Sequence, residues 1–311
     1  MRARRRTCEA GVGMTLAATR RKPSLRGDGL GTVLLFLPPA LLVFTIFVVL
    51  PIGEASWFSL FDWNGYGSPQ HFVALRNYVR LLAFVPFRTA LLNNLLVIAI
   101  SLCIQIPVAI GAASLLSGPG RLTVVMRLIL FLPYILAEVA AGLIWRFVFD
   151  GNFGLVAVAA RELGMNAPFM LADPDLARVA LMVVVTWKYF GFHMMLVLAG
   201  LQGIDPELRQ AARMDGATGA QIFRHVTLPL LRPTLRVSVF FAVIGSLQLF
   251  DIVMPLTAGG PGNATQTMAT FLYNFGITRM KIGFGSAVGV VLFLISATFS
   301  IVYNRWVPGE R

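Results

Sequence analysis

The chain has 311 residues, of which 57% are hydrophobic and 13% charged, and its formal net charge is +12. Soluble domains contain about a quarter charged residues, so this composition excludes an ordinary soluble domain and indicates a polytopic membrane protein. The basic excess does not require nucleic acid as a partner, because basic residues beside membrane spans face the anionic headgroups of the lipid bilayer.

Apolar runs long enough to cross about 30 Å of hydrocarbon as helices occur six times. We therefore predict an all-α membrane protein with one membrane domain at residues 29–311, preceded by a basic, disordered tail at residues 1–28. The first apolar run has the length of a span and lacks a cleavage site for a signal peptide. The six predicted spans are Leu30–Gly53, Thr89–Leu116, Leu128–Phe149, Val179–Leu201, Val237–Ala258 and Phe284–Val307.

The distribution of lysine and arginine predicts the orientation of these spans. With the N-terminus inside, the cytoplasmic segments hold 17 of the 26 basic residues: eight in the N-terminal tail, two at Arg121 and Arg127, five in the loop before the fifth span and two at the C-terminus. The positive-inside rule therefore places both termini and this central loop in the cytoplasm. The outside loop after the third span is expected to carry a short helix around Leu155–Leu163.

The central loop, residues 202–235, is polar and helix-forming between two apolar segments. Asp205 suits a helix N-cap, and Pro206 suits the first helical position. Gly216 and Gly219 then allow a sharp turn, and a second short helix follows until Pro229 and Pro233 stop it. Small side chains on one face of the first helix would let another protein approach its backbone closely.

The order of residues in this loop resembles the EAA loop of the membrane subunits of ATP-binding-cassette importers. Gln210 stands where that family usually has Glu. Two further segments resemble the carbohydrate-uptake branch related to the maltose and glycerol-3-phosphate permeases: Phe72–Tyr78, and Thr257–Pro261 with its Thr-x-Gly-Gly-Pro pattern. The residues that carry the EAA resemblance, and that it implies contact an ATPase subunit, are Gln210, Ala211, Ala212, Asp215, Gly216, Ala217, Phe223, Leu228 and Pro229.

The resemblance implies a type I importer permease in the bacterial inner membrane and a set of partners. These are a second homologous permease subunit, two copies of an ATP-binding subunit, and a periplasmic or lipid-anchored solute-binding protein. The lysines are Lys22, Lys188 and Lys281, and none is followed by Ser or Thr as in a phosphate-binding loop. We therefore expect no cofactor in this chain, with ATP and Mg²⁺ bound by the ATPase subunit.

Polar residues inside the predicted spans are the candidates for the solute path, because charged groups in a membrane usually face water or a partner. Asp251 after Gln248 is the first candidate, and the alternative for Asp251 is a salt bridge to the partner subunit. Trp187, Lys188 and Tyr189 form an aromatic and cationic cluster that suits sugar, although helix packing explains such clusters equally well. Asn94 could bond to solute or across helices.

The sequence also bears on two other classes of function, an ATP-independent transporter or channel and a membrane-embedded enzyme. A secondary transporter or channel that works without an ATPase has no reason to carry the EAA-like loop. A membrane-embedded enzyme would need clustered catalytic side chains, and the sequence contains neither such a cluster nor metal-ligand spacing. We therefore expect no catalytic and no metal-binding residues, and a function in transport.

Overall fold

The structure is a computed structural model that describes residues 28–306, so the predicted tail lies almost wholly outside the described residues. The described chain divides into two compact units, one ending at Pro51 and the other beginning at Ile52. The first contains helix α1 (Asp28–Phe44) and the π-helical turn η1 (Thr45–Val49), and helix α2 (Leu50–Phe58) continues the same apolar run.

The second unit is helical, and within residues 52–306 its only β pairing is an isolated bridge between Phe61 and Phe72. Its elements are α3 (Arg76–Ala83), α4 (Val85–Ile100), η2 (Ser101–Gln105), α5 (Ile106–Leu115), α6 (Arg121–Ile135), α7 (Glu138–Val148), α8 (Leu155–Glu162), α9 (Pro174–Gln202), α10 (Pro206–Met214), α11 (Gly219–Ile222), η3 (Phe223–Thr227), α12 (Leu228–Leu230), α13 (Arg232–Leu247), α14 (Val253–Thr257), α15 (Met268–Phe271), η4 (Leu272–Ile277) and α16 (Ile282–Trp306).

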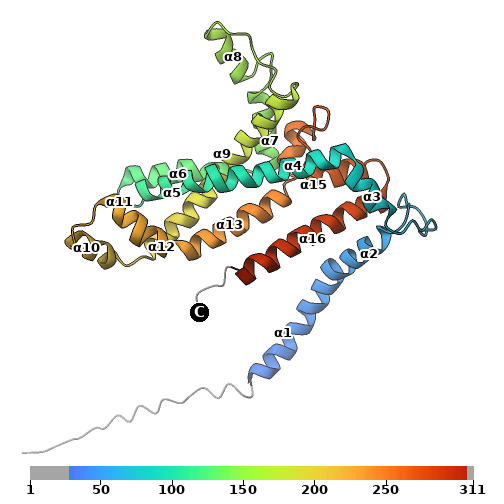
Figure 1. The fold of residues 1–311 in the computed structure, drawn as a ribbon, viewed down its shortest axis with the longest axis horizontal. Coiled ribbons are helices and arrows are strands. Elements are labelled where there is room, and N and C mark those ends of the chain that lie inside the picture. Colours follow the sequence, from blue (N-terminus) through green and yellow to red (C-terminus); the bar gives the residue numbers. More distant parts are fainter. Residues whose placement is uncertain (1–27, 307–311) are drawn as a thin grey trace, which may run out of the picture. The chain divides into compact units, whose positions relative to one another are not determined.

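Helix α9 is the centre of this unit, since two of its three buried clusters draw on it. One cluster joins α9 to α7 and the segment 249–256 through residues such as Leu181 and Ile252. Another joins the far end of α9 to α5 and to Leu231. A third, aromatic cluster around Phe87 and Phe271 joins α4 to α15, η4 and α16. In Figure 1, α10 and α11 lie at one end of the bundle and α3 at the other.

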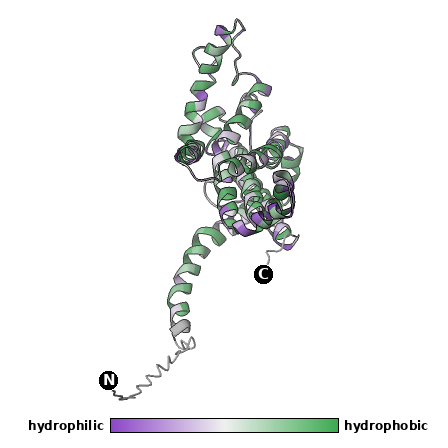
Figure 2. Cartoon of the chain, turned by 90° about the vertical axis from the view of Figure 1, so that its left-hand side faces the viewer, coloured by the Kyte–Doolittle hydropathy of each residue, from purple (hydrophilic) through white to green (hydrophobic). Residues whose placement is uncertain are grey.

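Four helical stretches are long and apolar enough to span a membrane, and two bent pairs bring the number of candidate spans to six. The predicted all-α fold is therefore confirmed. Figure 2 shows that hydrophobic residues predominate along these helices. The short helix expected around Leu155–Leu163 is present as α8. Val307, the predicted end of the last span, lies outside the described residues.

The structure corrects the third and fifth predicted spans. The third is not one straight helix, because Leu136 and Ala137 are extended and the axes of α6 and α7 differ by 98°. The fifth, predicted to run to Ala258, ends as helix α13 at Leu247, and α14 is a separate helix after it. Helix α14 packs closely on α7, since a Cβ at Gly142 would lie 2.5 Å from Cγ of Pro255.

Candidate functional site

The first half of the loop between α9 and α13 has the local structure that its sequence predicts. Asp205 caps α10, and its carboxylate accepts a hydrogen bond from the backbone amide of Glu207 at 2.9 Å. Helix α10 ends in a Schellman turn, in which the amide of Gly216 donates to the carbonyl of Arg213 and the amide of Ala217 donates to that of Ala212. Gly216 has a φ of +80°, a left-handed angle that favours glycine.

The second half of the loop begins at a capping box formed by Thr218 and Gln221. Gly219 starts α11 without a left-handed backbone angle, so the turn depends on Gly216 and not, as predicted, on both glycines.

Pro229 and Pro233, predicted to stop the second helix, instead lie at the starts of α12 and α13. Ile222 and Thr227 are buried in this second half of the loop, and Leu231 at its end packs with residues of α5 and α9. The loop is therefore a folded element with its own caps and its own anchors.

Four of the nine EAA-like residues are exposed on the surface of this element, and the other five are partly buried. Gln210, Ala211, Asp215 and Gly216 are exposed. Next to them Met214 is 88% exposed, an unusual position for a large apolar side chain. The remaining predicted contact residues are partly buried: Ala212, Ala217, Phe223, Leu228 and Pro229. The loop thus offers a small, mixed surface of backbone and short side chains to a partner.

A second candidate site is a cavity of about 560 Å³ between η2, the α6–α7 bend, α9 and α13. Three of the predicted solute-path residues line it, namely Tyr189, Gln248 and Asp251. Asp251 is exposed and lies between the end of α13 and the start of α14. It is therefore in the break of the predicted fifth span and not inside a straight helix.

Glu138, also in the cavity wall, accepts a hydrogen bond from the Tyr189 hydroxyl at 2.7 Å. His193 is another polar residue of the wall, and its ring is held by a neighbour, since its Nδ1 lies 2.7 Å from the hydroxyl of Ser238. Aromatic faces complete the wall, with the rings of Tyr134 and Phe192 stacked at a centroid separation of 5.0 Å. The cavity therefore combines flat apolar surfaces with hydrogen-bond acceptors.

The structure adds two residues to the cavity wall that sequence reasoning missed, Ser101 and Gln105. They are four residues apart in a predicted apolar span, and Val97, four residues before Ser101, lines the cavity too. Polar residues that recur at helical spacing within a span are the signal that would have found them.

Lys188 and Trp187 do not lie in this cavity. The ammonium of Lys188 is buried and donates to the carbonyls of Pro133 at 3.0 Å and Tyr134 at 3.1 Å, and also to that of Leu136. It therefore caps the end of α6 at the bend. Trp187 lines a different, mostly apolar cavity of about 980 Å³ between α4, α5, α6 and α9. Neither side chain lines the polar cavity that contains the other candidates for the solute path.

Asn94 is buried and bonds across helices, the second of its two predicted alternatives. Its amide nitrogen donates to the carbonyl of Ser246, and its carbonyl oxygen accepts from the amide of Met268 at 2.8 Å. The neighbouring Asn93 donates to the carbonyl of Ala264 at 2.7 Å. These two amides fix α4 to α13 and to the segment before α15.

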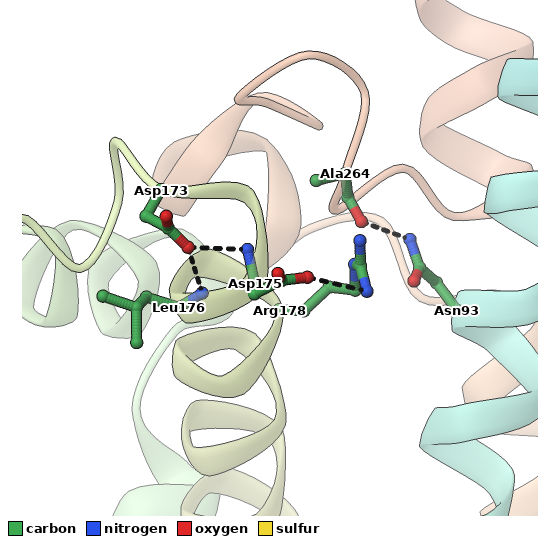
Figure 3. A network of polar contacts seen from close by, with 6 residues as sticks. All are labelled: Asn93, Asp173, Asp175, Leu176, Arg178 and Ala264. Carbon is green, nitrogen blue, oxygen red and sulfur yellow. Dashed lines mark hydrogen bonds and ion pairs between the residues drawn. The ribbon is translucent and has the colours of Figure 1, made fainter.

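Figure 3 shows Asn93 and Ala264 beside the start of α9. There the carboxylate of Asp173 caps the first turn of α9, and Arg178 pairs with Asp175 at 3.3 Å. This ion pair lies at the rim of the larger apolar cavity, with Asp175 largely exposed, while Nε of Arg178 is buried and has no hydrogen-bond partner among the described residues.

Comparison with known proteins gives concordant matches to membrane transport permeases. The sulfoquinovosyl glycerol transport system permease protein of Agrobacterium fabrum is 33% identical over 280 residues, which cover 90% of this chain and 91% of that protein. The trehalose/maltose transport system permease protein of Thermococcus litoralis is 31% identical over 271 residues, covering 87% and 92%.

A crystal structure of a bacterial ABC transporter involved in the import of the acidic polysaccharide alginate has a chain with the same fold. The TM-score is 0.79 at 22% sequence identity, and the match covers 92% of this chain and 98% of that chain. Residues 105–310 match the family described as binding-protein-dependent transport system inner membrane component. Since this match spans more than half of the chain, the protein belongs to that family of transport permeases.

Proposed function

We propose that this chain is the membrane-spanning permease subunit of an ATP-driven importer for a carbohydrate or a related polar solute. In this proposal the surface of α10 and the turn at Gly216 docks on a separate ATPase subunit. The observation that carries the proposal is this exposed, independently capped element, whose apolar Met214 and short Ala211 face outward next to a glycine-dependent turn.

Such an element can transmit a motion as well as bind a partner. Leu231 is buried in a cluster with residues of α5 and α9, and α12 leads into α13 through a bend of 67°. A displacement of α10 by a closing ATPase pair would therefore be passed to α13, which ends at Leu247 just before Gln248 and Asp251 of the cavity wall. The spans would then alternate between two access states, with the ATPase cycle biasing their populations.

The solute assignment rests on the relatives and on the cavity chemistry. The names of the relatives describe uptake of sugars and glycosides. Stacked aromatic rings with nearby carboxylate and amide oxygens suit a sugar, because the rings contact its apolar face and the oxygens accept from its hydroxyl groups. Asp251, Gln248 and Tyr189 remain in the proposed path, whereas Trp187, Lys188 and Asn94 are assigned to packing.

The remaining partners and the orientation belong to the same proposal. A second permease subunit would complete the path, two ATPase subunits would bind ATP and Mg²⁺, and a solute-binding protein would deliver solute from outside. Both termini and the α10–α12 element would face the cytoplasm of a bacterial cell, with this chain in the inner membrane. The chain itself would hold no cofactor and perform no catalysis.

Reconstitution tests this proposal directly. The chain is combined in proteoliposomes with a second permease subunit, an ATPase subunit and a solute-binding protein from the same organism, and uptake of a panel of labelled sugars is measured with and without ATP. We expect uptake only with ATP and only with an ATPase whose phosphate-binding lysine is intact. Equal uptake without the ATPase would contradict coupling and favour a channel or a secondary transporter.

A further inference from the structure

We propose that the polar cavity admits neutral or positively charged carbohydrates and rejects anionic ones, with Asp251 as the residue that sets this charge preference. The inference rests on the proposed function, because it concerns the solute that passes through that cavity. Fold alone leaves the charge of the solute open, since a transporter of the same fold is described as importing an acidic polysaccharide.

The first support is the charge of the cavity wall. It contains two carboxylates, Glu138 and Asp251, and no lysine or arginine. Its only basic side chain is His193, which is buried and bonded through Nδ1 to the hydroxyl of Ser238. The groups that a solute would meet at this wall are therefore acceptors or negative charges.

The second support is where the nearby cations lie. Lys188 is close enough to Glu138 to interact with it electrostatically, but its ammonium is held by the carbonyls at the end of α6. Arg178 is paired with Asp175 at the rim of the other cavity. Within residues 28–306 the ion pairs do not include Asp251, so the charge of Asp251 faces the cavity without a counter-ion.

This arrangement has a direct consequence for binding. An anionic sugar that enters would give up part of its hydration and meet two carboxylates, with no cation to replace the lost water. A neutral sugar can donate hydroxyl hydrogen bonds to Asp251 and Glu138. An ammonium group gains further, because it can pair with Asp251 and lie over the aromatic rings of Tyr134 or Phe192.

Three β-1,4-linked disaccharides of similar size separate these cases: cellobiose is neutral, the glucosamine dimer chitobiose is cationic, and cellobiouronic acid is anionic. Their binding to the assembled permease–ATPase complex in nanodiscs is measured by calorimetry, without the solute-binding protein, so that the specificity of that protein does not enter. We expect the anionic sugar to bind at least about tenfold more weakly than the other two.

Variants of Asp251 then test which residue causes the difference. Asp251→Asn should reduce the preference for chitobiose over cellobiouronic acid, and Asp251→Lys should reverse it. Glu162→Gln is the matched control, because Glu162 is an exposed carboxylate on α8 that does not line the cavity. The control should leave all three affinities unchanged.

The outcomes separate the inference from the proposed function. Equal binding of the three sugars, or an order that Asp251→Lys leaves unchanged, would overturn the charge preference while ATP-dependent sugar uptake still stood. Binding of none of them, together with no ATP-dependent uptake of any sugar in the reconstituted system, would overturn both.

Discussion

Nζ of Lys188 on α9 lies 3.0 Å from the carbonyl oxygen of Pro133 in the last turn of α6. The last carbonyls of a helix have no partner within the helix, and in a membrane they cannot rely on water. The ammonium of Lys188 bonds three of them, from Pro133, Tyr134 and Leu136, where α6 breaks before α7. One buried cation therefore stabilises the 98° bend that shapes the wall of the polar cavity.

Lys188→Met should lower the stability of the protein. The thioether has nearly the same length but no donor, so three carbonyls, of which that of Pro133 is buried, lose their partner, and removing a hydrogen-bonded charge of this kind costs about 1.5–3 kcal/mol. The measurement is the thermal stability of the detergent-solubilised protein, followed by fluorescence-detected gel filtration. Lys281→Met, at an exposed lysine, serves as the control. A Lys188→Met protein as stable as the control would contradict the capping function.

Gly191→Ala should also destabilise the protein, for a steric reason. Helices α6 and α9 approach so closely that a Cβ at Gly191 would lie 2.3 Å from the carbonyl oxygen of Leu130 and 2.8 Å from Cα of Phe131. Both atoms belong to backbone and cannot rotate away, so the helices must separate, at a cost of about 1–3 kcal/mol. Gly111→Ala is the matched control, because a Cβ there meets nothing within 4 Å. The same thermal assay compares the two, and an equal effect would refute this account.

The sequence was sufficient for the elements whose cause is local. Asp205, Pro206 and Gly216 predicted the start and end of α10, because caps and left-handed turns depend on neighbouring residues only. The apolar runs predicted where the spans lie. They did not predict the break at Leu136. A run of apolar residues shows that a segment can lie in a membrane but not whether its helix axis changes direction, and the residues on both sides of this break are apolar. Pro133 is not a sufficient signal, since Pro38 and Pro39 lie inside α1 without breaking it.

Which residues line the cavity could not be predicted from the sequence, because this depends on how the helices pack. Lys188 and Tyr189 are adjacent in sequence, yet successive residues of a helix point about 100° apart. Tyr189 therefore faces Glu138 and the cavity, whereas Lys188 faces the end of α6. Which of the two faces the cavity depends on how α9 is rotated against α6. These helices pack closely at Gly191, and the local sequence of α9 alone does not specify that contact.

The orientation of the spans is the third prediction. Since 17 of the 26 basic residues fall on one side in the six-span topology, that side should be the cytoplasm. A fusion of alkaline phosphatase after Pro229 should be inactive, and one after Gly262 should be active, because this enzyme folds only outside the cytoplasm. Green fluorescent protein at the same two sites gives the complementary readout. If both sites reported the same side, the proposed topology would be wrong.

The fourth prediction concerns the turn that closes α10. Gly216→Ala places a side chain on a residue with φ of +80°, which costs about 1–2 kcal/mol, although the added Cβ meets no atom within 4 Å. The penalty therefore falls on the turn and not on packing. We expect normal membrane insertion and normal stability of the bundle, together with a loss of ATP-dependent uptake, since the turn no longer holds the docking surface in place.

Two further variants at this turn separate conformation from side-chain bulk. Gly216→Asn should retain more uptake than Gly216→Ala, because asparagine adopts left-handed angles more readily. Gly219→Ala should leave uptake unchanged, since Gly219 has no left-handed angle and a Cβ there also meets nothing within 4 Å. If Gly216→Ala and Gly219→Ala lowered uptake equally, added bulk rather than the backbone angle would be the cause. If neither changed uptake, the Gly216 turn would not be part of the coupling surface.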